Sequence, residues 1–191
     1  MQAVEVQVFE GTTVARRMTR AEYDDLVQRG FFGEERIELI HGIVVRMAPI
    51  GPQHSDIVDE LNLRLVRALG DRARIRVQNP SIADDESEPQ PDIAVVPLGR
   101  YSKQHPDRAH LVIEVAESSL AYDRKTKGPL YAASGIPEYW IVDVNARVIE
   151  VHTLPVDGLY TSVTRVEESD TASPQAFPDF VLEVAELFSA T

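Results

Sequence analysis

The stretch that decides the fold lies between Pro91 and Lys127, and it reads Pro91-Asp92-Ile93-Ala94-Val95-Val96, then Leu111-Val112-Ile113-Glu114-Val115, then Asp123-Arg124-Lys125-Thr126-Lys127. The first two parts are short apolar runs, which are typical of strands buried in a sheet. Asp92 stands near the start of one run, and Glu114 interrupts the other. Because burying an unpaired charge costs several kcal/mol, these two carboxylates require a partner such as a lysine or a metal ion.

Length and composition limit the number of domains, the kinds of site and the cellular compartment to be expected. The chain has 191 residues, of which 43% are hydrophobic and 26% charged. We expect an N-terminal extension over residues 1–18 and one domain over residues 19–191. The sequence contains no cysteine, which excludes disulfides, thiolate metal sites and cysteine nucleophiles. Residues 1–18 lack the apolar core of a signal peptide, and no apolar run reaches the roughly 20 residues of a membrane span. We therefore expect a cytoplasmic protein with no membrane partner.

The net charge constrains the choice of partner. The formal charge is −12 at pH 7. Binding to a phosphate backbone normally requires a basic surface, so this acidity counts against a nucleic-acid substrate. A local basic groove, or a divalent cation in an acidic site, would reduce the repulsion.

The rest of the chain reads as alternating strands and helices. Thr19 and Glu22 form a capping-box pattern that predicts a helix ending at Gly30. Apolar residues at helical spacing predict a second helix over residues 54–69, and a third, with an uncertain start, lies between Ser118 and Gly135. Alternation, turn residues and β-branched residues predict the remaining elements: strands at 36–40, 43–45, 74–78, 81–83, 91–96, 110–116, 136–142, 147–154 and 159–166, and a short terminal helix or extended tail at 182–188.

Four polar features of these elements have two interpretations each. Glu38 lies on one face of a strand, and an exposed face is favoured about two to one over a role as a third site carboxylate. His54 begins the core-facing stripe of its helix, where a structural or capping histidine is at least as well supported as a site residue. Lys127 either pairs with Asp123 at the surface or points toward the sheet with Tyr131. The acidic run at 84–88 lacks the glycine and spacing of a calcium loop, which favours a solvated turn.

Asp92 and Glu114 suit a divalent cation. Magnesium prefers oxygen ligands and keeps several waters, so one or two carboxylates suffice to hold it. Such a cation polarises a phosphoryl oxygen, and a nearby lysine offsets the charge that develops on the phosphate. The pattern predicts a metal-dependent phosphodiesterase.

Several ordered motifs resemble those of a known family. They are Ile37-Glu38-Leu39-Ile40-His41-Gly42, Gly51-Pro52-Gln53-His54, Pro89-Gln90-Pro91-Asp92-Ile93, Val112-Ile113-Glu114-Val115, Asp123 to Lys127, Tyr131, and Gly135 to Asp143. From Thr19 onward the chain resembles the Uma-type family of restriction-endonuclease-like proteins within the PD-(D/E)xK nuclease superfamily. The resemblance implies an α/β fold of restriction-endonuclease type, with a central mixed sheet, flanking helices and an antiparallel hairpin extension.

The resemblance also implies roles for individual residues. Asp92, Glu114 and the Val115 carbonyl are expected to hold Mg²⁺ or Mn²⁺, Lys127 to be the catalytic lysine, and Glu38 to assist as a ligand or base. His54, Gln90 and Tyr131 are expected to line the site. The superfamily pattern has lysine two residues after the glutamate, where this chain has Ala116, so the mechanism requires Lys127 to reach Glu114. Gly128 replaces a leucine that is frequent in the family, and a glycine there favours a looser turn in the segment that aims Lys127 at the site.

Two further expectations follow. DNA or another nucleic acid is the expected substrate, and exposed hairpin edges predict a homodimer. The main alternative is a noncatalytic binding or regulatory module that retains the nuclease fold, which the acidity and the missing lysine at position 116 favour.

Overall fold

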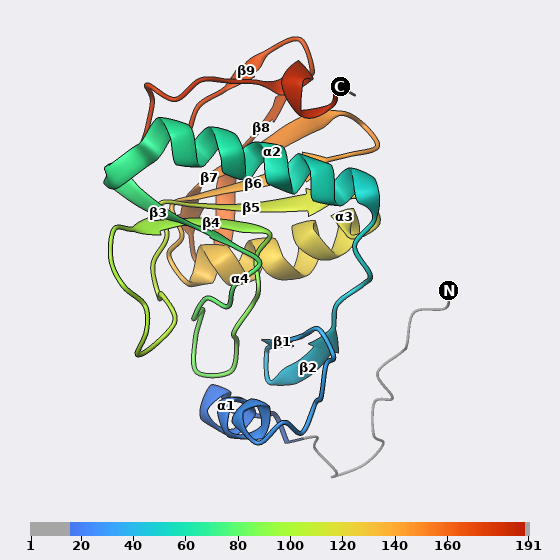
Figure 1. Cartoon of the computed structure of the whole chain (residues 1–191), viewed down its shortest axis with the longest axis vertical. Coiled ribbons are helices and arrows are strands. Elements are labelled where there is room, and N and C mark those ends of the chain that lie inside the picture. Colours follow the sequence, from blue (N-terminus) through green and yellow to red (C-terminus); the bar gives the residue numbers. More distant parts are fainter. Residues whose placement is uncertain (1–15, 190–191) are drawn as a thin grey trace.

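A six-stranded mixed sheet forms the centre of the molecule, in the order β3-β4-β5-β6-β7-β8. The computed structural model describes residues 16–189, so most of the predicted N-terminal extension lies outside the described residues (Figure 1). Strands β5 and β6 run parallel, and the other neighbouring pairs of this sheet are antiparallel. The strands are β3 (Ala73–Val77), β4 (Ile93–Pro97), β5 (Leu111–Ala116), β6 (Glu138–Asp143), β7 (Val148–Val156) and β8 (Leu159–Val166).

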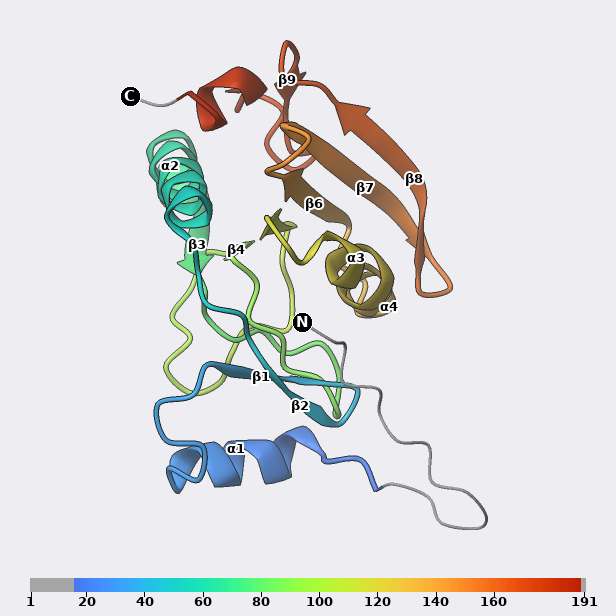
Figure 2. The ribbon, with the colours of Figure 1, turned by 90° about the vertical axis from the view of Figure 1, so that its right-hand side faces the viewer.

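Helices cover both faces of this sheet, as Figures 1 and 2 show. Helix α2 (Pro52–Leu69) packs on one face with the C-terminal segment, and its buried side chains include Leu61 and Leu65. On the other face lie α3 (Leu120–Tyr122), a π-helical turn (Asp123–Lys127) and α4 (Gly128–Ala133). Every residue of β4 except Pro97, and all of β5 and β6, are buried, as the continuous apolar runs predict.

A smaller N-terminal unit lies beside the sheet and consists of α1 (Arg20–Gln28), β1 (Ile37–Ile40) and β2 (Ile43–Arg46). The predicted capping box is present, because the Thr19 side chain accepts from the Glu22 backbone and the Glu22 side chain accepts from the Thr19 backbone. Strands β1 and β2 form the predicted antiparallel hairpin. The hairpin is tied to the segment before β4 by reciprocal backbone hydrogen bonds between Leu39 and Glu88.

The C-terminal part forms the predicted antiparallel extension. The β6–β7 and β7–β8 pairs continue the sheet outward from β5. Two-residue strands β9 (Thr171–Ala172) and β10 (Leu182–Glu183) pair with each other, and a 3₁₀ turn (Val184–Leu187) follows. A second 3₁₀ turn (Gly70–Arg72) ends α2. Within residues 16–189, no helix combines the length and apolar character needed to cross a bilayer.

Three expectations about local structure were wrong. Residues 81–83 form no strand, because their backbone is taken up by irregular bonds such as Ser81 N–H to the Pro89 carbonyl. Strand β4 begins at Ile93, so Pro91 and Asp92 precede it. The face of β1 that carries Glu38 is not wet, since Glu38 is only 2% exposed. All four residues of β1 are buried, whereas β2, the other strand of the hairpin, is exposed or half-buried along its length.

Candidate active site

A cavity of about 300 Å³ opens between the N-terminal unit, the start of α2 and the end of β5. Six of the eight predicted site residues line it: Glu38, His54, Asp92, Glu114, Val115 and Lys127. The other two, Gln90 and Tyr131, are not part of the lining but bond to residues that are. The fold thus brings together side chains that are up to 89 positions apart in the sequence.

Glu114 is the centre of the arrangement. Its side chain is 4% exposed and projects from the middle of the sheet. Lys127 Nζ donates to Glu114 Oε1 over 2.9 Å, and the Tyr131 hydroxyl donates to the same oxygen over 2.8 Å. The second oxygen, Oε2, accepts from the Asp92 backbone N–H over 3.2 Å. Lys127 therefore reaches Glu114. The proposed mechanism requires this contact, because Ala116 stands where the superfamily pattern has lysine.

Asp92 is held by donors on three other elements. His54 Nε2 donates to Asp92 Oδ2 over 3.1 Å, and the Val115 N–H donates to the same oxygen over 2.9 Å. Gln78 Nε2 donates to Oδ1 over 3.1 Å. Burial alone would raise the pKa of Asp92, but the hydrogen bonds from His54, Val115 and Gln78 outweigh it and leave the pKa below its usual value. Asp92 is thus fixed as a carboxylate, and His54 orients it.

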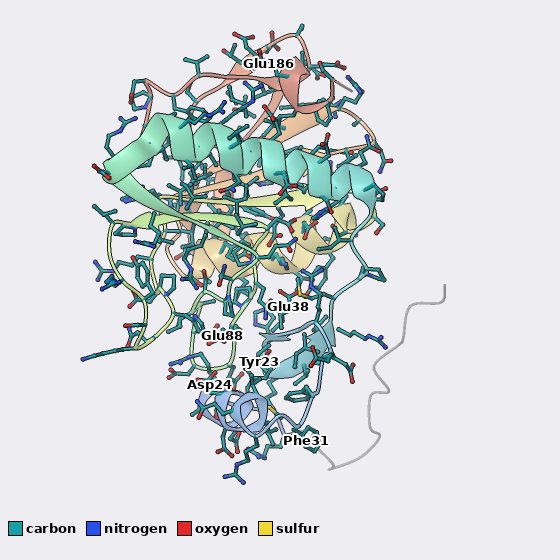
Figure 3. The ribbon with its side chains drawn as sticks, in the orientation of Figure 1. Tyr23, Asp24, Phe31, Glu38, Glu88 and Glu186 are labelled. Carbon is teal, nitrogen blue, oxygen red and sulfur yellow. The ribbon has the colours of Figure 1, made fainter. Side chains whose placement is uncertain are left out.

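Glu38 completes the site from the N-terminal unit, and Figure 3 shows it at the boundary between that unit and the sheet. Glu38 Oε2 lies 3.3 Å from Lys127 Nζ and accepts from the Gln90 backbone N–H over 3.1 Å. Oε1 accepts from the Tyr122 hydroxyl over 3.2 Å. The Gln90 side chain donates to the Ile37 carbonyl over 2.9 Å, which fixes β1 beside the segment before β4. Gln90 is therefore a positioning residue for Glu38.

The site cluster contains more carboxylates than ammonium groups. Burial by itself would lower the pKa of Lys127, but the carboxylates of Glu114 and Glu38 outweigh it and raise the pKa, so the ammonium stays charged. Burial raises the pKa of Glu114 well above its usual value, although Lys127 opposes that rise. One ammonium group faces two buried carboxylates directly, and the Asp92 carboxylate lies beside them.

The π-helical turn explains how Lys127 is aimed. The Gly128 N–H bonds to the Asp123 carbonyl five residues earlier, instead of the usual four. Pro129, which has no N–H to donate, follows directly at the start of α4. A Cβ on Gly128 would lie 3.3 Å from the Asp123 carbonyl oxygen and 3.6 Å from the Tyr139 ring, so glycine allows close packing here. The absence of a side chain at Gly128 therefore suits this turn.

The prediction missed two site residues on the same helical segment. Asp123 is 2% exposed, lines the cavity and accepts from Ser119 Oγ over 2.5 Å. Burial raises the pKa of Asp123 to about 6, although the Ser119 hydrogen bond lowers it. Tyr122 lines the cavity and bonds to Glu38. The four-residue spacing between Asp123 and Lys127, which places both on one helix face, could have identified Asp123 as a site residue. Nothing in the sequence singled out Tyr122.

The mouth of the cavity adds positive charge to this acidic interior. Arg36 and Arg46, which flank the β1–β2 hairpin, both line it, together with an apolar wall from Met47 to Ile50. Glu117 contributes a further carboxylate. Two arginines thus line the cavity of a chain whose overall charge is −12, although Arg46 also lies 3.8 Å from the Glu35 carboxylate.

A metal ion would have to be held by few protein ligands. Within residues 16–189, no group of three or more histidine, aspartate and glutamate side chains is arranged to hold a metal. The cavity nevertheless presents oxygen donors, from Asp92 and Glu114, to an open volume beside them. A hard cation that keeps most of its water shell fits such a donor set.

Among the buried carboxylates outside the cavity, Glu88 has the least support from its neighbours. Glu88 is 4% exposed and belongs to the acidic run that was expected to be a solvated turn, so the expectation fails at this residue. Its Oε2 has no hydrogen-bond partner among the described residues, and its Oε1 lies 4.0 Å from His105 Nε2. Burial raises the pKa of Glu88 to about 7, with Asp24 adding to the rise and Arg20 opposing it. Figure 3 shows Glu88 between α1 and the rest of the molecule.

Glu88→Gln is expected to stabilise the protein at pH 8 by about 2–3 kcal/mol. Between the ordinary pKa of 4.5 and the folded value of about 7, the folded protein keeps a proton that the unfolded chain releases, so wild-type stability falls as pH rises through this window. Glutamine does not titrate, so the variant does not lose stability in this window. Urea unfolding at pH 5 and pH 8 measures the difference in the free energy of unfolding between variant and wild type, with the exposed Glu34→Gln as control. An equal effect of Glu88→Gln at both pH values would contradict the assignment.

Comparisons with known proteins identify the family and the fold. A family model described as "Uma2: Putative restriction endonuclease" matches residues 20–185. The fold resembles the crystal structure of a "putative nuclease belonging to DUF820" from Anabaena variabilis, with a TM-score of 0.63 and 16% sequence identity over 81% of this chain and 90% of that chain. No protein in the curated set matches. Family and fold support a nuclease-like function. The chain belongs to the Uma2 family and has its restriction-endonuclease-like α/β fold.

Proposed function

We propose that the chain is a metal-dependent nuclease that hydrolyses phosphodiester bonds in DNA or another nucleic acid. The observation that carries the proposal is the 2.9 Å contact between Lys127 Nζ and Glu114 Oε1, with Asp92 beside them in the same cavity. A buried lysine between buried carboxylates is costly to build, and a structural role alone would be served more cheaply by apolar residues. Perturbed titratable groups that converge on a cavity indicate an active site.

The residues present fit Mg²⁺ or Mn²⁺. Asp92 and Glu114, with the Val115 carbonyl, would hold the ion, and it would supply polarisation of a phosphoryl oxygen and a bound water of lowered pKa. The number of protein ligands is small, in agreement with the preference of Mg²⁺ for retained water.

Each remaining residue has a role that follows from its contacts. Lys127 keeps a positive charge beside the reacting phosphate and offsets the negative charge that develops there. Glu38, held by Tyr122 and the Gln90 backbone, accepts a proton from the attacking water or serves as a further ligand. His54 holds Asp92 in one orientation. Arg36 and Arg46 at the mouth attract the phosphate backbone that the rest of the surface repels.

A substrate screen tests the proposal. Single- and double-stranded DNA and RNA are incubated with the protein and 10 mM Mg²⁺ or Mn²⁺, and cleavage of at least one substrate is expected, with none in EDTA. The same metals should raise the melting temperature, because an ion at ten times its Kd stabilises the folded state by about 1.4 kcal/mol.

The two readouts separate the rival functions. A melting shift without cleavage of any substrate would favour the noncatalytic binding module that the fold also permits. Neither a shift nor cleavage would remove the metal site altogether. Cleavage that persists in EDTA would contradict the metal dependence.

A further inference from the structure

The β8 strand leaves one edge of the sheet open. It is the last strand in the sheet order and pairs with β7 along one side. Along its other side, no backbone group of residues 159–166 bonds to another part of the described chain. Figure 2 shows β8 as the outermost strand of the extension, and α4 packs near its N-terminal end, where Tyr160 joins the cluster that holds Tyr131. An open edge of eight residues is a ready template for another strand.

This edge lacks the features that normally keep edges from pairing. Charged residues and proline are the common safeguards, yet Leu159–Val166 contains no proline and a single charge, Arg165. At the opposite edge of the sheet, β3 has two arginines in five residues. Apolar side chains on the β7–β8 hairpin are more than half exposed: Leu154 61%, Val156 54%, Leu159 60% and Val163 56%. The hairpin thus combines free backbone groups with an apolar surface.

A second copy of the chain fits this edge. A strand edge is complementary to another strand edge, and a two-fold axis through the middle of β8 would pair it antiparallel with itself. Two molecules of charge −12 repel each other, which favours contact along a segment without acidic residues, and Leu159–Val166 is such a segment. With the axis at Val163, so that the two copies of this residue lie opposite each other, the two Arg165 residues would lie about 14 Å apart along the strands, beyond the screening length of about 8 Å.

We propose that the protein forms a homodimer in which the β8 strands of two copies pair antiparallel and join the two six-stranded sheets into one. The proposal rests on the sheet edge and not on the nuclease function. The cavity stays accessible, since it is built at β5, which is three strand positions and about 14 Å from β8.

Sedimentation velocity on the full chain between 1 and 100 µM tests the proposal. Wild type is expected at twice the chain mass of 21.3 kDa. Val163→Glu places a carboxylate from each copy near the axis and should weaken the dimer Kd at least tenfold. Val66→Glu is the matched control, because Val66 is 51% exposed on α2, far from the edge, and this variant should remain dimeric. A monomeric wild type at 100 µM, or an equally dimeric Val163→Glu, overturns the proposal.

Amide hydrogen exchange on wild type gives a readout that needs no variant. The β8 amides should exchange up to tenfold more slowly at 100 µM than at 1 µM, whereas the β3 amides should show no such dependence. Concentration-independent exchange in β8 overturns the proposal even where Val163→Glu fails to fold.

Discussion

Replacement of Lys127 by methionine is expected to lower the free energy of unfolding by about 3–5 kcal/mol and to abolish cleavage. The Lys127 ammonium lies 2.9 Å from Glu114 and 3.3 Å from Glu38, and all three side chains are at most 5% exposed. Methionine fills a similar volume but leaves two buried carboxylates without a counter-charge. Urea unfolding at pH 8 measures the loss. Burial already raises the pKa of Glu114 and Lys127 opposes that rise, so without the lysine Glu114 takes up a proton more readily and the loss should be smaller at pH 5.

Lys125→Met is the matched control, since Lys125 is exposed two positions earlier in the same helical turn. Its effect should stay within about 0.5 kcal/mol. A double-mutant cycle with Glu114→Gln isolates the pair, and a coupling of about 0.5–3 kcal/mol is expected because the two residues touch. If Lys127→Met proved as stable as Lys125→Met, the Lys127–Glu114 ion pair would not contribute to stability and the proposed charge balance would be wrong.

Burial patterns explain why most of the sheet was predictable and Glu38 was not. The continuous apolar run Leu111 to Val115 can be stable only between two covered faces, so it marks a central strand whatever its neighbours are. Alternation in β1 carries less information, because it shows which residues share a face but not whether that face meets water. The covering segment, which holds Glu88 and Gln90, comes some 50 residues later. The contact between them is decided by tertiary packing.

The site was predictable in its ligands and not in its geometry. Asp92 and Glu114 stood out because a carboxylate in an apolar strand requires a partner. Whether Lys127 is that partner depended on the path of the helix after Ser118. The sequence Gly128-Pro129 argued against a continuous helix there. The π-helical turn removes the conflict, since its five-residue hydrogen bond accommodates the proline and leaves Asp123 and Lys127 on the cavity side. Such a turn has no signature in the hydrophobic pattern.

Asp92→Asn is expected to reduce cleavage by about 10²–10³-fold or more and to eliminate the metal-dependent rise in melting temperature. The three groups that bond to the Asp92 carboxylate, from His54, Gln78 and Val115, are all donors. An asparagine amide would turn an N–H₂ group toward one of them and would remove the anionic oxygens that suit Mg²⁺. A stability cost of about 1–3 kcal/mol should accompany the change.

Asp143→Asn separates the role of the site from the general cost of neutralising a buried aspartate. Asp143 is 5% exposed at the end of β6, is not part of the cavity lining, and accepts a backbone hydrogen bond from Ala146 that asparagine can also accept. Cleavage and the metal-dependent melting shift should survive in Asp143→Asn and vanish in Asp92→Asn. Lys127→Met should keep the melting shift while losing cleavage, because Lys127 is not a ligand. Retention of the shift in Asp92→Asn would place the ion elsewhere and overturn the proposed metal site.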